Sequence, residues 1–211
     1  MSFTLHCAAQ RGDTRNTLCP RRRVITGFSD LQTAARFDHV AAEFEGSRRS
    51  LDGFRLADCI VLDVDNDHGQ IVQPEQIAED FPGVAHMIVF SRHDMQPKGS
   101  SPAVPRFHCY FPIEPTTDRA EVEQLKRSVC AAFPYFDANA IDAARFMFGV
   151  ESPRGFAVEG ALLLSDLFPY VDEEGAEGST AALQEIPEGQ RNSTLSRLSL
   201  IHISEPTRLL S

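Results

Sequence analysis

Short apolar runs alternate with longer amphipathic stretches along roughly the first 170 residues. Runs rich in Val, Ile, Phe and Tyr, or alternating apolar with polar, predict β-strands where turn residues flank them. Such runs lie at residues 24–28, 58–65, 85–91, 106–111, 145–150 and 156–164. Gly160 falls inside the last run and predicts a kink there. A polar stretch with three prolines, residues 93–105, is expected to be a long loop.

Helical periodicity separates several of these runs. Ser29 is typical of an N-cap, Gln32 suits its capping-box partner, and Gly46 would end the helix. The apolar face expected of this helix is formed by Phe37, Val40, Ala41 and Phe44.

Two more helices are expected further along the chain. Pro74 suits the first turn of a short helix through Phe81. A longer helix should begin after Thr116 or Thr117, and its core-facing stripe would consist of Val122, Leu125, Val129 and Phe133. Alternating strands and helices of this kind predict an α/β or α+β domain over residues 1–170.

The last forty residues differ in composition from this domain. Residues 171–185 are acidic and small, which predicts a linker. Residues 186–198 are expected to start a further helical domain that is cut off soon afterwards. The tail at 199–211, SLIHISEPTRLLS, does not continue any amphipathic period and is interpreted as non-native sequence.

Composition narrows the class of protein only modestly. The 42% hydrophobic and 24% charged residues are ordinary for a soluble globular chain. No apolar run approaches the roughly 18 residues that span a bilayer, and no secretory signal begins the sequence, so a cytoplasmic protein without membrane contact is expected. Five unclustered cysteines favour a reducing compartment, with Cys59, Cys109 and Cys130 as small core residues.

The net charge of −10 does not decide whether the partner is a nucleic acid. Residues 151–211 hold ten acidic and four basic side chains, so they contribute −6 of the total. The remaining −4 comes from residues 1–150, where acids of a metal site would be included. Charge alone therefore neither supports nor excludes a polynucleotide partner.

Two carboxylates at the end of a predicted strand are the most informative feature. The apolar residues 60–62 lead into Asp63, Val64 and Asp65. Residues two apart on a strand point to the same face, so the two aspartates should project side by side. Like charges this close repel each other unless a cation lies between them. Magnesium prefers carboxylate oxygens, and phosphoryl-transfer enzymes hold metal-bound triphosphates in this way.

Other interpretations of this motif compete with a magnesium site. An Asp-rich turn after a strand is often only a solvated loop. A calcium loop starting at Asp63 would need Gly at its sixth position and Glu at its twelfth, where this chain has His68 and Pro74, so that reading fails. A sugar-transferring enzyme with a D-x-D metal site remains open on the motif alone.

Further polar residues follow later predicted strands. Ser91 and Arg92 come directly after residues 87–90, and Arg106 and His108 lie two apart on one strand face. A cation and an imidazole beside two carboxylates would suit a metal-bound triphosphate. Taken alone, His108 is more often a hydrogen-bonded core histidine.

A third acidic segment lies near Arg145. Asp137 follows the aromatic pair 135–136 and could supply a third metal-facing carboxylate. Asp142 lies three residues before Arg145 and could simply cap a helical turn. Both aspartates remain candidates for the third acid.

The order of these motifs resembles that of archaeo-eukaryotic-type primases, also called primase-polymerases, in the form found in phages, plasmids and other bacterial mobile elements. The resemblance rests on DVDNDH, SRHDM, PRFHCYFP and FDANAIDAARFMFG and covers roughly residues 15–155. GQRNSTL at 189–195 is similar to the beginning of the helical C-terminal primase domain. The implied fold is a two-module α/β core with an RNA-recognition-like mixed sheet that bears the site.

The resemblance also implies roles for single residues. Asp63 and Asp65 would hold catalytic Mg²⁺ or Mn²⁺ ions with Asp137, whose spacing to Arg145 matches the family better than that of Asp142. His108 would contact the triphosphate of an NTP or dNTP. Weaker candidates for phosphate or template contacts are Ser91, Arg92, Arg106 and Arg145. The family often has a small residue at the position of Arg106, a departure that leaves this arginine's role open.

The implied activity is a metal-dependent nucleotidyltransferase that makes or extends primers on single-stranded DNA during replication of a mobile element, with a replicative helicase as a possible partner. Two alternatives stay open. One is a non-catalytic module that binds single-stranded nucleic acid or an origin, and the other is a metal-dependent phosphodiesterase.

Overall fold

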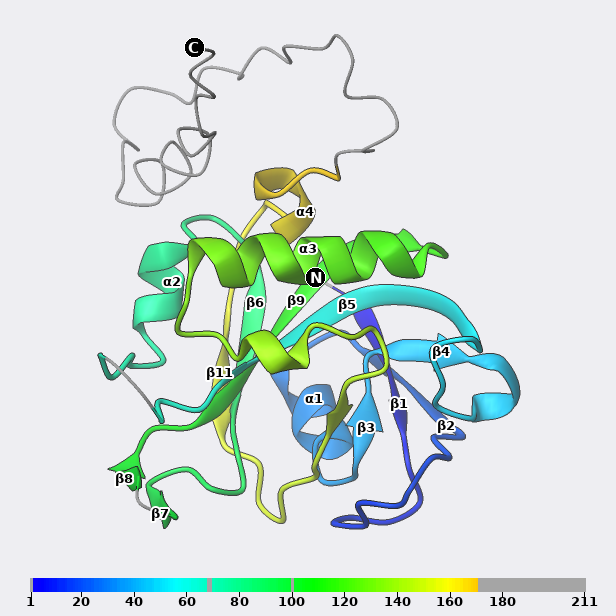
Figure 1. Ribbon diagram of the computed structural model, residues 1–211, viewed down its shortest axis with the longest axis horizontal. Coiled ribbons are helices and arrows are strands. Elements are labelled where there is room, and N and C mark those ends of the chain that lie inside the picture. Colours follow the sequence, from blue (N-terminus) through cyan, green and yellow to red (C-terminus); the bar gives the residue numbers. More distant parts are fainter. Residues whose placement is uncertain (1, 68–69, 100, 171–211) are drawn as a thin grey trace, which may run out of the picture. The chain divides into compact units, whose positions relative to one another are not determined.

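The two largest β-sheets of the structure are antiparallel and lie against one another. The structure, a computed structural model, describes residues 2–67, 70–99 and 101–170. One sheet has the strand order β11-β6-β9-β5-β4 and the other the order β10-β3-β1-β2. Helices cover the outer face of the first sheet (Figure 1). The expected α/β class is therefore confirmed, and the named strands pair antiparallel.

The five-stranded sheet is built around two long central strands. They are β5 (Phe54–Val64) and β9 (Phe107–Thr116). Both faces of these strands are covered, which explains why their sequences are nearly continuous apolar runs. The strands β6 (His86–Phe90), β11 (Gly155–Val158) and β4 (Ala42–Phe44) complete the sheet.

Helices α2 (Gln76–Asp80) and α3 (Arg119–Ala132) pack on one face of this sheet. The ring of Phe81 lies 5.0 Å from that of Phe111 and 4.6 Å from that of Phe133, between ring centroids. Aromatic rings at these separations contribute to stability beyond their buried area. Short helical elements continue the chain at η2 (Ala138–Ala140) and α4 (Leu164–Leu167).

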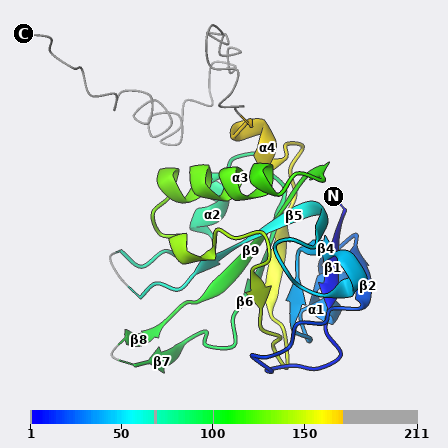
Figure 2. The ribbon, with the colours of Figure 1, turned by 45° about the vertical axis from the view of Figure 1, so that its right-hand side comes forward.

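The opposite face packs against the second sheet, which consists of β1 (Phe3–Cys7), β2 (Arg21–Ile25), β3 (His39–Val40) and β10 (Phe146–Met147), and against α1 (Phe28–Ala34) (Figure 2). A single apolar cluster joins them, with Leu5 and Leu31 on one side and Val61, Val89 and Tyr110 on the other. The predicted two-module arrangement thus has a shared core.

The expected helix over residues 30–45 is largely wrong. Helix α1 ends at Ala34, and residues 39–44 form β3 and β4 instead. The buried carboxylate of Asp38 accepts hydrogen bonds from the backbone N–H groups of Gly149 (2.8 Å) and Asp13 (3.1 Å). Contacts with segments far away in the sequence therefore override the local helical period.

Several boundaries also differ from the expected ones. The N-cap of α1 is Gly27 rather than Ser29, and that of α3 is Asp118, whose side chain accepts from the N–H of Ala120. The expected loop at 93–105 contains the hairpin β7 (Gln96–Lys98) and β8 (Ser101–Val104). The strand β1 was not predicted, although all five of its residues are buried. The 3₁₀ turn η1 (Glu45–Ser47) follows β4.

The strand expected at 156–164 ends early, at Val158. A Cβ atom at Gly160 would lie only 2.3 Å from the carbonyl oxygen of Gly83, so the two backbones approach too closely for any other residue. The predicted irregularity at Gly160 is thus present as a close backbone contact.

The cysteines behave as expected from the sequence. All five are free and buried, which agrees with the expectation of core residues at Cys59, Cys109 and Cys130. Burial raises the pKa of the Cys7 thiol to about 12, so it stays protonated at neutral pH.

Residues 1–170 form one unit. The predicted linker, the start of a further helical domain and the tail at 199–211 lie outside the described residues and stay predictions. In the described part of the chain, no helix has the length and apolar character needed to cross a membrane.

A buried hydrogen-bonded pair links the two sheets. His39 Nδ1 lies 2.8 Å from the carbonyl oxygen of Phe37, and its Nε2 lies 2.8 Å from the Tyr110 hydroxyl. A carbonyl can only accept, so Nδ1 carries the proton and the neutral ring accepts from the tyrosine. Burial lowers the pKa of His39 to about 4 and raises that of Tyr110.

Acid is therefore expected to destabilise this contact. Between about pH 6.5 and pH 4 the unfolded chain binds a proton at His39 and the folded chain does not, so stability falls as the pH falls. The loss due to His39 is expected to be roughly 3 kcal/mol. Urea unfolding measures the free energy of unfolding at each pH. This free energy should fall less steeply between about pH 6.5 and pH 4 for His39→Gln than for the wild type. Equal slopes would contradict the prediction.

Candidate functional site

Asp63 and His108 lie opposite each other on the two central strands. Their Cα atoms are register partners between β5 and β9, close to the end of the sheet where β5 stops. His108 Nε2 is 3.3 Å from Asp63 Oδ1, but this contact does not have hydrogen-bond geometry. Asp63 Oδ1 is therefore buried and accepts no hydrogen bond. A buried carboxylate oxygen in this condition is costly and favours a cationic ligand.

Asp137 is brought to the same place from a segment after α3. Its backbone N–H donates to the carbonyl oxygen of Asp63 (2.9 Å), which fixes the two residues together. Its Oδ1 accepts from the N–H of Asn139 (2.9 Å) and so caps η2. Asp63 is therefore in contact with both His108 and Asp137, whereas a shared site that also includes Asp65 stays a prediction.

Arg145 lies between the two carboxylates. Its Nη2 is 2.9 Å from Asp63 Oδ2 and 3.5 Å from Asp137 Oδ2. Burial disfavours the charged guanidinium, but Asp63, Asp137 and Asp142 outweigh this effect and raise the pKa of Arg145. Of the two candidate third acids, Asp137 has its carboxylate hydrogen-bonded to the guanidinium that also binds Asp63, whereas Asp142 accepts from the Arg145 backbone N–H through its carbonyl oxygen.

Lys126 supports the loop that carries these groups, and it was not singled out from the sequence. Its side chain is buried, and Nζ donates to the carbonyl oxygens of Ala140 (3.3 Å) and Asp142 (3.1 Å). Burial lowers the pKa of Lys126 to about 8. The sequence signal was a lysine four residues after Val122, inside the apolar stripe of α3.

Asp65 is half-buried and follows the last residue of β5. The next residue, Asn66, has a positive φ of 52° and shapes the turn. Its Nδ2 donates to the carbonyl oxygens of Val72 (2.9 Å) and Pro105 (2.7 Å), and its Oδ1 accepts from the N–H of Val72 (2.9 Å). Asn66 thus fixes how the chain leaves Asp65.

Asn66→Ala is expected to lower the free energy of unfolding by about 2–4 kcal/mol, because three hydrogen bonds are lost and alanine disfavours positive φ. Urea denaturation measures this. Asn16→Ala is a matched control, since the Asn16 side chain accepts one hydrogen bond within the described residues, from the N–H of Leu18 at an exposed site, and its loss should cost less than about 1 kcal/mol. Similar losses in both variants would contradict the role given to Asn66.

Arg106 does not lie with His108 on the open face, contrary to the prediction. The residue precedes β9 and its side chain is fully buried. Its guanidinium pairs with Asp67 (2.8 Å) and donates to the carbonyl oxygens of Gln96 (2.6 Å) and His93 (3.3 Å). A buried arginine with these partners anchors the β7–β8 hairpin and is not available to a phosphate as placed here.

Ser91 and Arg92 follow β6, as predicted. The Ser91 hydroxyl accepts from the N–H of His93 (3.1 Å), and the Ser91 N–H donates to the carbonyl oxygen of Arg106 (2.8 Å). The exposed Arg92 guanidinium lies over the ring of Phe148, 3.8 Å from its centroid. Ser91 therefore has a role in the turn, whereas Arg92 remains available to a ligand.

The residues around Arg145 meet the needs of a divalent cation only in part. The carboxylates of Asp63 and Asp137 suit a hard ion, and Asp63 Oδ1, 3.3 Å from His108 Nε2, accepts no hydrogen bond. Within residues 2–67, 70–99 and 101–170, however, no three Asp, Glu, His or Cys side chains gather closely enough to bind a metal ion. A metal site with Asp63, Asp65 and Asp137 therefore stays a prediction that requires Arg145 to move off the two carboxylates.

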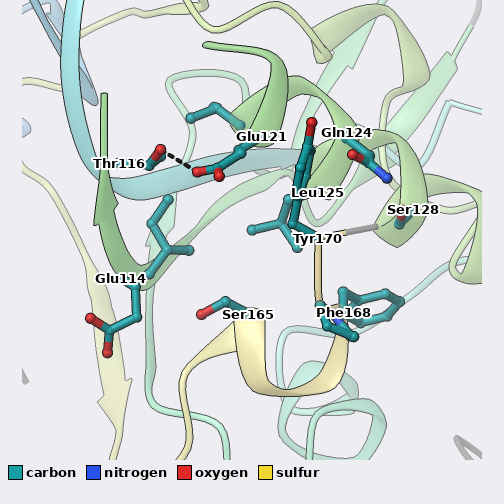
Figure 3. Close-up of a pocket in the computed structure, with 12 residues that line it drawn as sticks. Glu114, Thr116, Glu121, Gln124, Leu125, Ser128, Ser165, Phe168 and Tyr170 are labelled. Carbon is teal, nitrogen blue, oxygen red and sulfur yellow. Dashed lines mark hydrogen bonds between the residues drawn. The ribbon is translucent and has the colours of Figure 1, made fainter. Parts of the chain in front are cut away.

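A cavity of about 180 Å³ lies elsewhere, between α3, α4 and the far end of β9 (Figure 3). Its lining includes the apolar Leu125 and Phe168 and two acidic residues, Glu114 and Glu121, the latter accepting a hydrogen bond from Thr116. His108 stands at the opposite end of the same strand. None of the described residues that line the cavity is basic and two are acidic, which makes it a poor site for a triphosphate, so the cluster at Asp63 is the better candidate.

Comparison with known proteins gives little further information. No protein-family model matches the sequence, and no curated protein matches it. A solved structure that resembles the chain is the AEP domain of the cyanophage S-2L primase-polymerase, with 12% sequence identity and a TM-score of 0.42, covering 79% of this chain and 86% of that chain. At this identity and TM-score the likeness carries no weight for function.

Proposed function

We propose that this protein is a primase-polymerase, a metal-dependent nucleotidyltransferase that makes or extends primers on single-stranded DNA. The observation that supports this best is that the Asp63 carboxylate contacts both His108 and Arg145, that Arg145 also contacts Asp137, and that Asp63 Oδ1 accepts no hydrogen bond. These residues come from three separate segments whose order along the chain resembles that of archaeo-eukaryotic-type primases.

The charges of the cluster suit a nucleoside triphosphate. Asp63, Asp65 and Asp137 would hold Mg²⁺ or Mn²⁺, which would neutralise charge that builds up on the phosphates during transfer. Arg145 would leave the carboxylates and turn to the phosphates, for which its planar guanidinium is well suited. His108, whose side chain is 14% exposed, would donate to a phosphate oxygen.

A second candidate is a module that binds single-stranded nucleic acid without catalysis. It is favoured by the ion pairs of Arg145, which already compensate the charges of Asp63 and Asp137 without a metal ion. Such a module should bind equally well in EDTA and in manganese, and loss of Asp63 should not weaken binding.

The test is incubation of the full chain with circular single-stranded DNA, labelled nucleotides and Mg²⁺ or Mn²⁺. New labelled oligomers that grow with time support a primase-polymerase, and extension of an annealed primer separates extension from initiation. Binding without synthesis in either metal would favour the non-catalytic module. Shortening of an end-labelled single strand would instead indicate the phosphodiesterase.

A further inference from the structure

Two arginines and two phenylalanines form a continuous row beside the candidate site. The rings of Phe146 and Phe148 meet edge to face, with their centroids 5.2 Å apart. The Arg49 guanidinium lies 5.2 Å from the Phe146 centroid, and that of Arg92 lies 3.8 Å from the Phe148 centroid. The row therefore runs Arg49, Phe146, Phe148, Arg92, and is called the Arg–Phe row below.

The backbone explains why both rings face outward. Phe146, Met147 and Phe148 lie at the end of β10, an edge strand, where successive side chains point to opposite faces. Met147 is buried in the core shared by the two sheets, whereas both phenylalanines stay only half-buried. Packing of the core thus accounts for Met147 but leaves the outer surface of the row uncovered.

The row is attached directly to the candidate site. Phe146 follows Arg145, which bridges Asp63 and Asp137. Arg49 Nη1 donates to the carbonyl oxygen of Ala144 (3.2 Å), and Arg49 Nε is buried without a hydrogen-bond partner. Arg92 reaches the row from the end of β6, on the other sheet. Residues of both sheets therefore meet in one row, which the chain joins directly to Arg145.

We infer that the Arg–Phe row binds single-stranded DNA by base stacking and phosphate pairing, and places the strand next to Asp63. Bases stack on aromatic rings and on the planes of guanidinium groups, and arginines pair with the backbone phosphates. Every base has such a face, so binding should depend little on sequence. The inference deepens the proposed function, since it assigns the template strand a surface.

Two other pairs of arginine and phenylalanine in the described residues lack this continuity. Arg21 lies over Phe37 at 5.5 Å and Arg154 over Phe90 at 5.4 Å, each as a single pair. Arg21 belongs to β2, at the edge of the four-stranded sheet opposite β10. Arg21→Gln is therefore a matched control for Arg92→Gln, because each removes one exposed arginine above one ring.

Fluorescence anisotropy with a labelled oligothymidylate of about 20 nucleotides, in EDTA, tests the inference. Phe148→Ala and the double variant Phe146→Ala/Phe148→Ala are expected to weaken binding about tenfold or more. Arg92→Gln should weaken binding several-fold and reduce the dependence of log Kd on log salt by about one, whereas Arg21→Gln should bind within about twofold of the wild type. Circular dichroism checks that each variant is folded.

Several results would overturn the inference. One is an affinity of Phe148→Ala for the oligothymidylate within about twofold of the wild type. Another is an equal loss of affinity in Arg92→Gln and Arg21→Gln. The third is a duplex of the same length that competes for binding as well as the single strand does. If the double variant does not fold, the two arginine variants still decide. Because EDTA removes the metal, DNA binding is measured separately from primer synthesis. The expected losses of binding without any synthesis would support the Arg–Phe row and reject the proposed polymerase. Synthesis together with unchanged binding in these variants would support the polymerase and reject the row.

Discussion

Asp63→Asn is expected to reduce primer synthesis by about 1,000-fold or more without unfolding the protein. The substitution keeps the shape of the side chain but removes the negative charge that would bind a catalytic cation. It also leaves an amide oxygen able to accept from Arg145, which lies 2.9 Å from Oδ2 in the native protein. Incorporation of labelled nucleotides on circular single-stranded DNA measures the loss, and circular dichroism measures the fold.

Asp52→Asn serves as the control for this substitution. Asp52 is exposed in the turn just before β5, so the same chemical change there should leave synthesis within about twofold of the wild type. Asp65→Ala and Asp137→Asn should behave like Asp63→Asn if the three carboxylates share a cation. Synthesis by Asp63→Asn at the rate of Asp52→Asn would reject the metal assignment.

Arg145→Gln is expected to destabilise the protein in EDTA by about 1–3 kcal/mol, because Asp63 and Asp137 lose the cation between them. This loss is smaller than for a fully buried pair, since the Arg145 side chain is 33% exposed. A divalent cation should then bind the two carboxylates without a competitor, so millimolar Mn²⁺ should restore most of the lost stability. Urea unfolding with and without Mn²⁺ measures both effects.

Arg55→Gln is the matched control for Arg145→Gln. Arg55 pairs with Glu45 at 2.6 Å, but both side chains are exposed, at 48% and 70%, so its loss should change stability by less than about 1 kcal/mol and should not depend on Mn²⁺. Isothermal titration of Mn²⁺ should also show tighter binding to Arg145→Gln than to the wild type. Equal affinity, with no rescue of stability, would mean that Arg145 does not compete with a cation at these carboxylates.

The parts of the site that depend on local geometry could be predicted from the sequence. Asp63 was expected on a sheet face because an apolar strand leads into it. His108 was expected there as well, because it lies within an apolar strand. The residues alone left both Asp137 and Asp142 open as the third acid, and the resemblance to primase-polymerases favoured Asp137 by its spacing to Arg145. The hydrogen bond from the Asp137 N–H to the Asp63 carbonyl oxygen places Asp137 beside Asp63, and no local pattern encodes this contact.

Arg106 and the segment at 36–44 show where local patterns failed. Arg106 has the alternation of a strand residue, but Asp67 and two carbonyl oxygens of the hairpin segment draw its side chain into a buried site. Residues 37–44 have a helical period of apolar residues, yet His39 and Val40 pair with β1 and β10. In both cases buried polar groups found partners far away in the sequence, and leaving them unpaired would cost more than local preference provides.

The sequence by itself determined the α/β class, the central strands β5, β6 and β9, and the face on which Asp63 and His108 lie, because these follow from a period of two residues and from burial of apolar runs. Only the tertiary structure decided that Asp137 joins them, that Arg145 stands between the carboxylates, and that Arg49 and Arg92 flank two phenylalanines. These contacts join residues far apart in the chain, so they depend on how the sheets pack and not on any local period.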